Sequence, residues 1–155
     1  MAHTHQLELL AEAIKDDLEA INGAAPYTQT MRYVTRDAAM IGQMQIWPNC
    51  VMVLSSCELA ADITNKMMHR WATWLFLVEM EAVPGTDPTT AAATLMTKMG
   101  DDIFFAMQSP NKSTHGGQCH LTEWLGFDLA TPSGTGKVNA IFTYRFRYSF
   151  ALDSP

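Results

Sequence analysis

The chain has 155 residues, about one ordinary domain, and 48% of them are apolar, so it can bury a core of its own without a disulfide or a structural metal. A formal net charge of -6 argues against a protein that grips nucleic acid through phosphates, because that affinity comes mainly from Lys and Arg. The odd number of cysteines and the absence of a secretory signal in MAHTHQLELL lead us to expect synthesis in a reducing, intracellular compartment.

No segment of the sequence is suited to crossing a membrane as a helix. The longest candidate, Trp71 to Val78, is much shorter than the roughly 20 apolar residues that such a helix needs. The sequence also shows no internal repeat at the period of a solenoid and no linker long enough to separate two domains. We therefore expect one soluble domain over residues 1–155.

The chain opens with a predicted amphipathic helix, with Thr4 as its cap and Gly23 as its stop. Residues 24–49 carry only a weak pattern, so most of this stretch is predicted to be loop, with a short strand around Tyr33. The β-forming run CVMVL then predicts a strand over Cys50 to Leu54. The apolar residues of the helix recur every three or four positions: Leu7, Leu10, Ala11, Ile14, Leu18 and Ile21.

A long strand is predicted over Met67 to Glu81, because two Trp, a Phe, a Thr and a Val favour extended backbone. Its even positions form a nearly clean apolar face. The opposite face also carries large apolar residues, namely Trp71, Leu75 and Leu77, so we expect other elements to pack on both faces of its middle.

A second helix is predicted to begin at Asp87 and Pro88, because Asp caps free amides and Pro suits the first helical turn. It should end before Ser109, which precedes a proline and is therefore disfavoured in helical backbone. Its apolar residues again follow helical spacing: Ala92, Leu95, Met96, Met99, Ile103, Phe104 and Met107.

The last two predicted strands form a long C-terminal hairpin around the turn TPSGTG. The first covers Cys119 to Leu129, where Cys119, Leu121, Glu123, Leu125, Phe127 and Leu129 alternate with His120, Thr122, Trp124 and Asp128. The second covers Lys137 to Leu152 with a strict two-residue period. The even-numbered residues from Val138 to Leu152 should face the core, whereas the odd-numbered residues, including Arg145 and Arg147, should face outward. The predicted fold is α+β, a mainly antiparallel sheet packed against two helices in the order α-β-β-α-β-β.

Two histidine motifs raise the question of a metal site. His3 and His5 form an HxH pair, but two ligands near a terminus make a poor site. The segment HGGQCH, from His115 to His120, would need Cys50 or Cys57 to complete a zinc site, and the tight CxxC pairs that structural zinc normally uses are missing from the sequence. We therefore predict no bound metal.

Nucleophilic and phosphate-binding motifs are also weak. A thiol nucleophile needs a histidine base, yet Cys119 and His120 are adjacent and would point to opposite faces of a strand. The segment SGTGKV, from Ser133 to Val138, matches only part of a phosphate-binding loop and leads into a strand instead of a helix. We predict that the protein is not an enzyme and carries no cofactor.

The order and pattern of these elements resemble the tail terminator and tail-completion proteins of long-tailed bacteriophages. The resemblance runs from about Leu7 to Leu152 and includes the opening helix, the short and long strands, the Asp-Pro-started helix and the hairpin ending in FTYRFRYSF. It implies a structural virion protein, made in the host cytoplasm and located in the neck at the top of the tail. Such proteins form a six-membered ring that ends growth of the tail tube and joins the tail to the head connector.

The resemblance also implies partners: further copies of the chain, the tail tube protein and the head-tail connector or stopper protein. DNA would slide through an acidic lumen that repels it. A symmetric ring needs two unlike patches per subunit, and our candidates are Trp71, Leu75 and Leu77 on the long strand and Arg145 and Arg147 on the final strand. Loops 24–49 and 111–117 are expected to contact the tube or the connector.

Two alternatives stay open at this point. A head-side neck connector or stopper protein would be similarly small and ring-forming, and pattern alone discriminates poorly between the two. An alternative of another class is a small thiol- or zinc-dependent enzyme, in which His115, Cys119 or His120 would converge with Cys50 or Cys57.

Overall fold

The computed structural model describes residues 5–64, 67–81, 88–110, 112–133 and 137–151, and it confirms the predicted α+β class. Two helices and a five-stranded, mostly antiparallel sheet occur in these ranges, with a short 3-10 turn. In chain order the elements are α1 (Gln6–Glu19), β1 (Tyr33–Thr35), η1 (Ala38–Met40), β2 (Asn49–Thr64), β3 (Met67–Glu81), α2 (Pro88–Gln108), β4 (Leu121–Ser133) and β5 (Lys137–Ala151).

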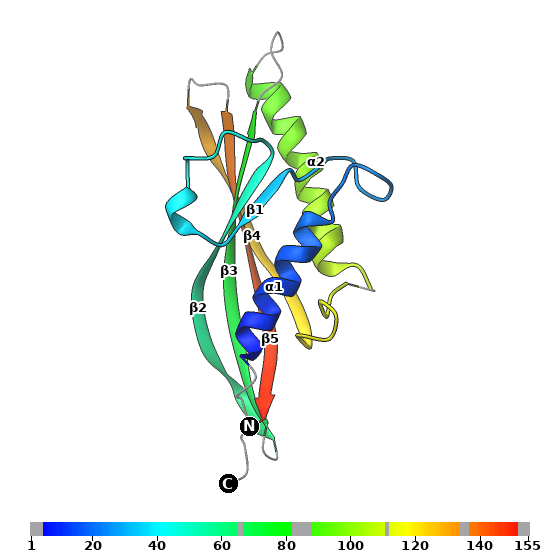
Figure 1. The fold of residues 1–155 in the computed structure, drawn as a ribbon, viewed down its shortest axis with the longest axis vertical. Coiled ribbons are helices and arrows are strands. Elements are labelled where there is room, and N and C mark those ends of the chain that lie inside the picture. The colour runs from blue at the N-terminus through cyan, green and yellow to red at the C-terminus, as the bar shows by residue number, and fades with distance from the viewer. Residues whose placement is uncertain (1–4, 65–66, 82–87, 111, 134–136, 152–155) are drawn as a thin grey trace.

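The strands lie in the order β1-β2-β3-β5-β4 and run along the long axis of the molecule (Figure 1). Only β1 is parallel to its neighbour β2, and it supplies the short strand predicted around Tyr33. The central pair, β3 and β5, is antiparallel and matches residue by residue from Met67↔Ala151 to Glu81↔Lys137. The predicted C-terminal hairpin is confirmed by the antiparallel pairing of β4 with β5.

The core lies between the sheet and the two helices. Alternate residues of β3 and β5 point toward the helices, and Phe76 of β3 stacks on Tyr144 of β5 with ring centroids 5.4 Å apart. The core parity predicted for β5 is confirmed from Val138 to Tyr148, while the side chains of Phe150 and Leu152 lie outside the described residues. The predicted stripe of α1 is buried from Leu10 to Leu18.

The boundaries of β2 differ from the predicted ones. The strand continues well beyond Leu54, to Thr64. The sequence did not reveal this part, because register shifts between Leu54 and Ser56 and between Leu59 and Ile63 break the two-residue period. A pattern based on strict alternation therefore stops at the first bulge.

Helix ends were also predicted imperfectly. The helix α1 ends at Glu19, before Gly23, which instead adopts a φ of +73° in the following turn. A side chain at Gly23 would place its Cβ 2.7 Å from Thr30 Oγ1, so this turn requires glycine. The predicted caps Thr4 and Asp87 lie outside the described residues.

The expectation that elements pack on both faces of β3 is met only in part, because the helices cover one face and only a loop covers one end of the other. Both helices lie on the same side of the sheet, so alternate residues from Ala72 to Met80 are buried while those between them are only partly covered. The second face, called the outer face below, is bounded at one end by the loop of residues 36–48, which includes η1.

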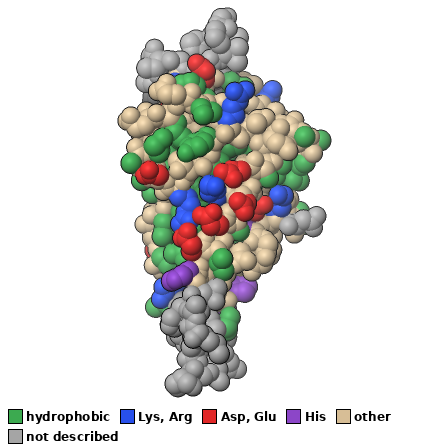
Figure 2. Space-filling model, viewed as in Figure 1, with side chains coloured by type: hydrophobic (Ala, Val, Ile, Leu, Met, Phe, Trp, Pro, Cys, Tyr) green, Lys and Arg blue, Asp and Glu red, His purple; other side chains and the backbone are tan. Residues whose placement is uncertain are grey.

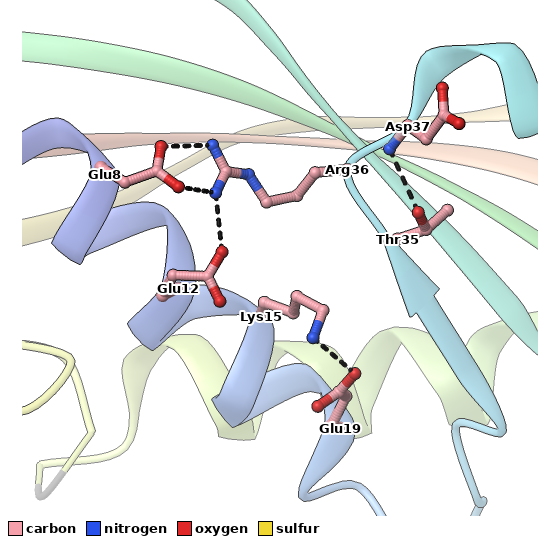
Figure 3. A network of polar contacts seen from close by, with 7 residues as sticks. All are labelled: Glu8, Glu12, Lys15, Glu19, Thr35, Arg36 and Asp37. Atoms are coloured by element: carbon pink, nitrogen blue, oxygen red, sulfur yellow. Dashed lines mark hydrogen bonds and ion pairs between the residues drawn. The ribbon is translucent and has the colours of Figure 1, made fainter.

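Two carboxylate clusters fix the segment that leads into this loop. Buried Asp102 of α2 accepts hydrogen bonds from the backbone amides of Thr28 and Gln29 at 2.6–3.1 Å. Arg36, just after β1, donates to Glu8 at 2.6 and 2.9 Å and to Glu12 at 2.7 Å on α1 (Figure 3). These contacts hold residues 22–36 against the helices and thereby set where the 36–48 loop begins.

Candidate assembly surfaces

The five predicted interface residues lie together on the outer face. In the register of the central strands, Trp71 is opposite Arg147, Leu75 is opposite Thr143, and Arg145 is opposite Thr73. All five side chains are partly exposed. The sequence predicted two separate patches, whereas the register joins them into one continuous surface, because β3 and β5 are immediate neighbours.

Arg145 is the centre of this surface. Its guanidinium donates to Glu123 of β4 at 2.6 Å and lies over the Trp71 ring, 4.3 Å from the ring centroid. The contact therefore spans three strands, from β3 through β5 to β4. Cation–π and carboxylate contacts at partly exposed sites each contribute modestly to stability. Their main effect here is to fix the orientation of the Arg145 guanidinium on the outer face.

The 36–48 loop packs over the far end of the outer face. The Trp47 indole donates to the Glu79 carboxylate, and the Lys137 ammonium lies 4.5 Å from the Trp47 ring centroid and 3.7 Å from Glu79 Oε1. A cavity of about 160 Å³ remains beneath the loop, lined in part by Ile41. The side chains of Ile41 and Ile46 are nevertheless 45% and 51% exposed.

A second apolar surface, which we call the aromatic groove, lies between α2 and β4. Its volume is about 390 Å³. Three aromatic side chains that line it are largely exposed, Phe104 at 46%, Trp124 at 51% and Phe127 at 42%, and Phe104 packs edge-on against Trp124. Its lining residues are Met96, Thr97, Gly100, Asp101, Phe104, Trp124, Phe127, Phe142 and Tyr144.

A β-bulge creates the groove. The register of β4 shifts between Trp124 and Gly126, so that Trp124 faces Tyr144 and Phe127 faces Phe142, both on the helix side. The predicted alternation, which set Phe127 and Trp124 on opposite faces, was therefore wrong beyond Leu125. Gly126 within the strand was the one available signal, because an isolated glycine there often marks a bulge.

The helix side of the groove also departs from the prediction. Phe104 belonged to the predicted core stripe of α2, but it lies at the open edge, while Met99, Ile103 and Met107 are buried. Gly100 permits close approach of the helix, because a Cβ there would lie 3.3 Å from the Phe142 ring. The helix therefore contacts β5 closely and leaves the β4 side open.

His115 has a structural environment. It is buried, its Nδ1 lies 2.7 Å from Asp17 of α1, and its ring packs against Phe146 at 5.2 Å. Lys112 also donates to Asp17, at 3.1 Å. Burial opposes ionisation of Asp17, but the hydrogen bonds from His115 and Lys112 outweigh it and lower the pKa of that carboxyl. This cluster ties the 112–118 loop to α1.

The cysteines do not converge with the histidines of HGGQCH. Burial raises the pKa of the Cys50 and Cys119 thiols, which disfavours the reactive thiolate. Cys57 lies on the helix side, with Sγ 3.2 Å from the Tyr148 hydroxyl, whereas His120 contacts Ser149 and His69 on the outer face. Within the described ranges, no group of three or more His, Cys, Asp or Glu side chains is arranged to hold a metal ion. His3 lies outside those ranges.

None of the described helices is both long enough and apolar enough to cross a membrane. A comparison with known proteins found no family model that matches the chain and no characterised protein of significantly similar sequence.

Proposed function

We propose that the protein is a structural component of long-tailed bacteriophages that assembles as a hexameric ring at the head-proximal end of the tail tube. The ring ends growth of the tube and joins the tail to the head connector. The order of elements from α1 to β5 supports this proposal, because apart from the short β1 and η1 it is the order of the resemblance noted from the sequence. The observation that carries it is the presence of two unlike apolar surfaces in one small fold.

A closed ring of identical subunits needs two different surfaces per subunit that match each other. The outer face with its adjoining loop is one such surface, and the aromatic groove is another. They differ in shape and chemistry, since the first carries Arg145 and Arg147 beside apolar side chains and the second is a concave aromatic groove. This asymmetry favours a head-to-tail contact over a two-fold dimer.

The partners follow from the same proposal. Within the two predicted contact loops, 24–49 and 111–117, the candidate contacts with the tail tube protein and the head-tail connector or stopper are residues 24–35 and 112–117, because loops on a rigid scaffold usually carry recognition. Both are held firmly, the first by Asp102 and Arg36 and the second by Asp17. The net charge of -6 suits a lumen through which DNA slides without binding.

The decisive experiment deletes the gene from its phage and compares lysates by negative-stain electron microscopy. We expect filled heads beside unattached tails of uncontrolled length, with rescue by the wild-type gene supplied in trans. Tails of normal length beside unjoined or leaking heads would instead assign the protein to the head side of the neck. Normal virions would refute a structural role in the neck altogether.

A further inference from the structure

We infer that the aromatic groove receives the 36–48 loop of a neighbouring copy of this chain, with Ile46 inserted beside Trp124 and Phe104. The inference rests on the proposed ring and names its contact surfaces. The sequence had offered only the outer face as an interface. The groove supplies the second, matching surface.

The size of the groove fits a protein partner. With roughly 200 Å² for each aromatic side chain, the half-exposed Phe104, Trp124 and Phe127 leave about 300 Å² of apolar surface in water. Leu129, 47% exposed and paired with Ala140 on the same side of the sheet as Phe127, enlarges the patch. A stable interface buries about 800 Å² on each partner, so this patch would form its apolar centre. Exposed patches of this kind usually mark interaction sites.

The 36–48 loop is preorganised. Asp37 accepts a hydrogen bond from the Ala39 amide at 2.9 Å, and Asn49 donates to the Ile46 carbonyl at 2.8 Å. With Trp47 fixed on Glu79, the backbone is held while about half of the Ile46 side chain stays exposed. A loop already held in its bound shape loses little entropy on docking.

Charge also matches across the proposed contact. One charged residue, the exposed acid Asp101, lines the groove. The exposed base Arg32 lies beside the loop, since its amide donates to the Pro48 carbonyl at 2.9 Å. Pairing Arg32 with Asp101 of the next copy would fix the register of docking. Figure 2 shows apolar side chains over the part of the surface where Figure 1 has this loop, beside the mixed charges of α1.

The positions of the two surfaces determine the kind of assembly. The groove lies at the β4 edge of the sheet, and the loop follows β1 at the opposite edge. Docking one onto the other leaves a free groove and a free loop at the two ends of any pair. Such a head-to-tail contact propagates from copy to copy, and the ring of the proposed function forms where its rotation closes.

The test uses the purified full chain and analytical ultracentrifugation over a range of concentrations up to about 1 mM. Trp124→Asp and Phe104→Asp break the groove from two different elements, and Ile46→Asp breaks the loop. Leu59→Asp is the matched control, because Leu59 is 65% exposed on β2 and belongs to neither surface. Circular dichroism of each variant verifies folding.

We expect wild type and Leu59→Asp to self-associate, and each groove or loop variant to do so at least about thirty-fold more weakly, as for loss of an interface hot spot. A mixture of Trp124→Asp with Ile46→Asp retains one intact groove and one intact loop, so it should form 1:1 dimers and nothing larger. Monomers in that mixture, wild-type association by the groove variants, or a monomeric wild type throughout would each overturn the inference.

Failure of this inference is distinguishable from failure of the proposed function. If the gene deletion gives tails of uncontrolled length while Trp124→Asp still forms rings, the protein is a terminator that uses other contacts. If the deletion leaves virions normal, the neck role fails, and the mixing experiment judges the loop-to-groove contact by itself.

Discussion

Replacing Asp102 with Ala is predicted to destabilise the fold by about 3 kcal/mol. The carboxylate is 3% exposed and accepts from the Thr28 amide at 3.0 and 3.1 Å, the Gln29 amide at 2.6 Å and the Thr28 hydroxyl at 3.2 Å. A donor that loses its acceptor on partial burial costs about 1–3 kcal/mol, at the upper end for partners that carry charge. Water can replace the lost acceptor at exposed Thr28, so the total cost for the two amides stays below twice the upper value for one donor.

Urea denaturation followed by tryptophan fluorescence measures the effect. With a slope of about 2 kcal/mol/M, a loss of about 3 kcal/mol lowers the midpoint by about 1.5 M. Asp101→Ala is the matched control. The Asp101 carboxylate is next to Asp102 in the chain but exposed, and such surface changes alter the free energy of unfolding by no more than about 0.5 kcal/mol. Asp102→Asn keeps an acceptor oxygen and should fall between the two. Equal midpoints for Asp101→Ala and Asp102→Ala would refute the reasoning.

Three further predictions concern other parts of the chain. The pKa of Asp17 is lowered in the folded state, so its contribution to the free energy of unfolding is present above the unfolded pKa of about 4 and is lost as pH falls through the folded pKa. Urea midpoints of Asp17→Asn should therefore change less than those of wild type between neutral and acid pH, and parallel pH profiles would contradict this. Arg145→Glu sets two acids together on the outer face and should cost about 1 kcal/mol of stability while abolishing ring assembly on tails; assembly at wild-type levels by electron microscopy would remove Arg145 from the interface. A thiol reagent should label Cys57 in the native protein and reach buried Cys50 and Cys119 only in urea, and native labelling of all three would show that the core opens.

The sequence predicted the fold well where periodicity was unbroken. In β5, each residue from Val138 to Tyr148 kept its parity, because the strand pairs with β3 without a shift. In β2 and β4, bulges near Ser55 and Leu125 reversed the parity, and one sequence offers little warning of them. Elements could therefore be identified even where the orientation of their side chains could not.

The candidate surfaces were predicted only in part, for a related reason. Arg145 was correctly predicted to face outward, and Trp71 was correctly set on the face of β3 opposite its even positions, but their mutual contact depends on β3 and β5 being neighbours. Strand order is a long-range property, since α2 and β4 separate these strands in the chain. The groove was missed because it combines a helix residue, Phe104, with a strand whose register shifts.

The β4 edge of the sheet has a composition that bears on assembly. Isolated proteins usually protect an edge strand with charges, prolines or a covering element. Along β4, Glu123 is already engaged by Arg145, while Trp124, Leu125, Phe127 and Leu129 are all more than 40% exposed. Such an edge favours association with another chain, and on a protein that stays monomeric it would promote aggregation. In the proposed closed ring, the next subunit would fill every groove, so the residues that would promote aggregation of a monomer would instead stabilise the interface between subunits.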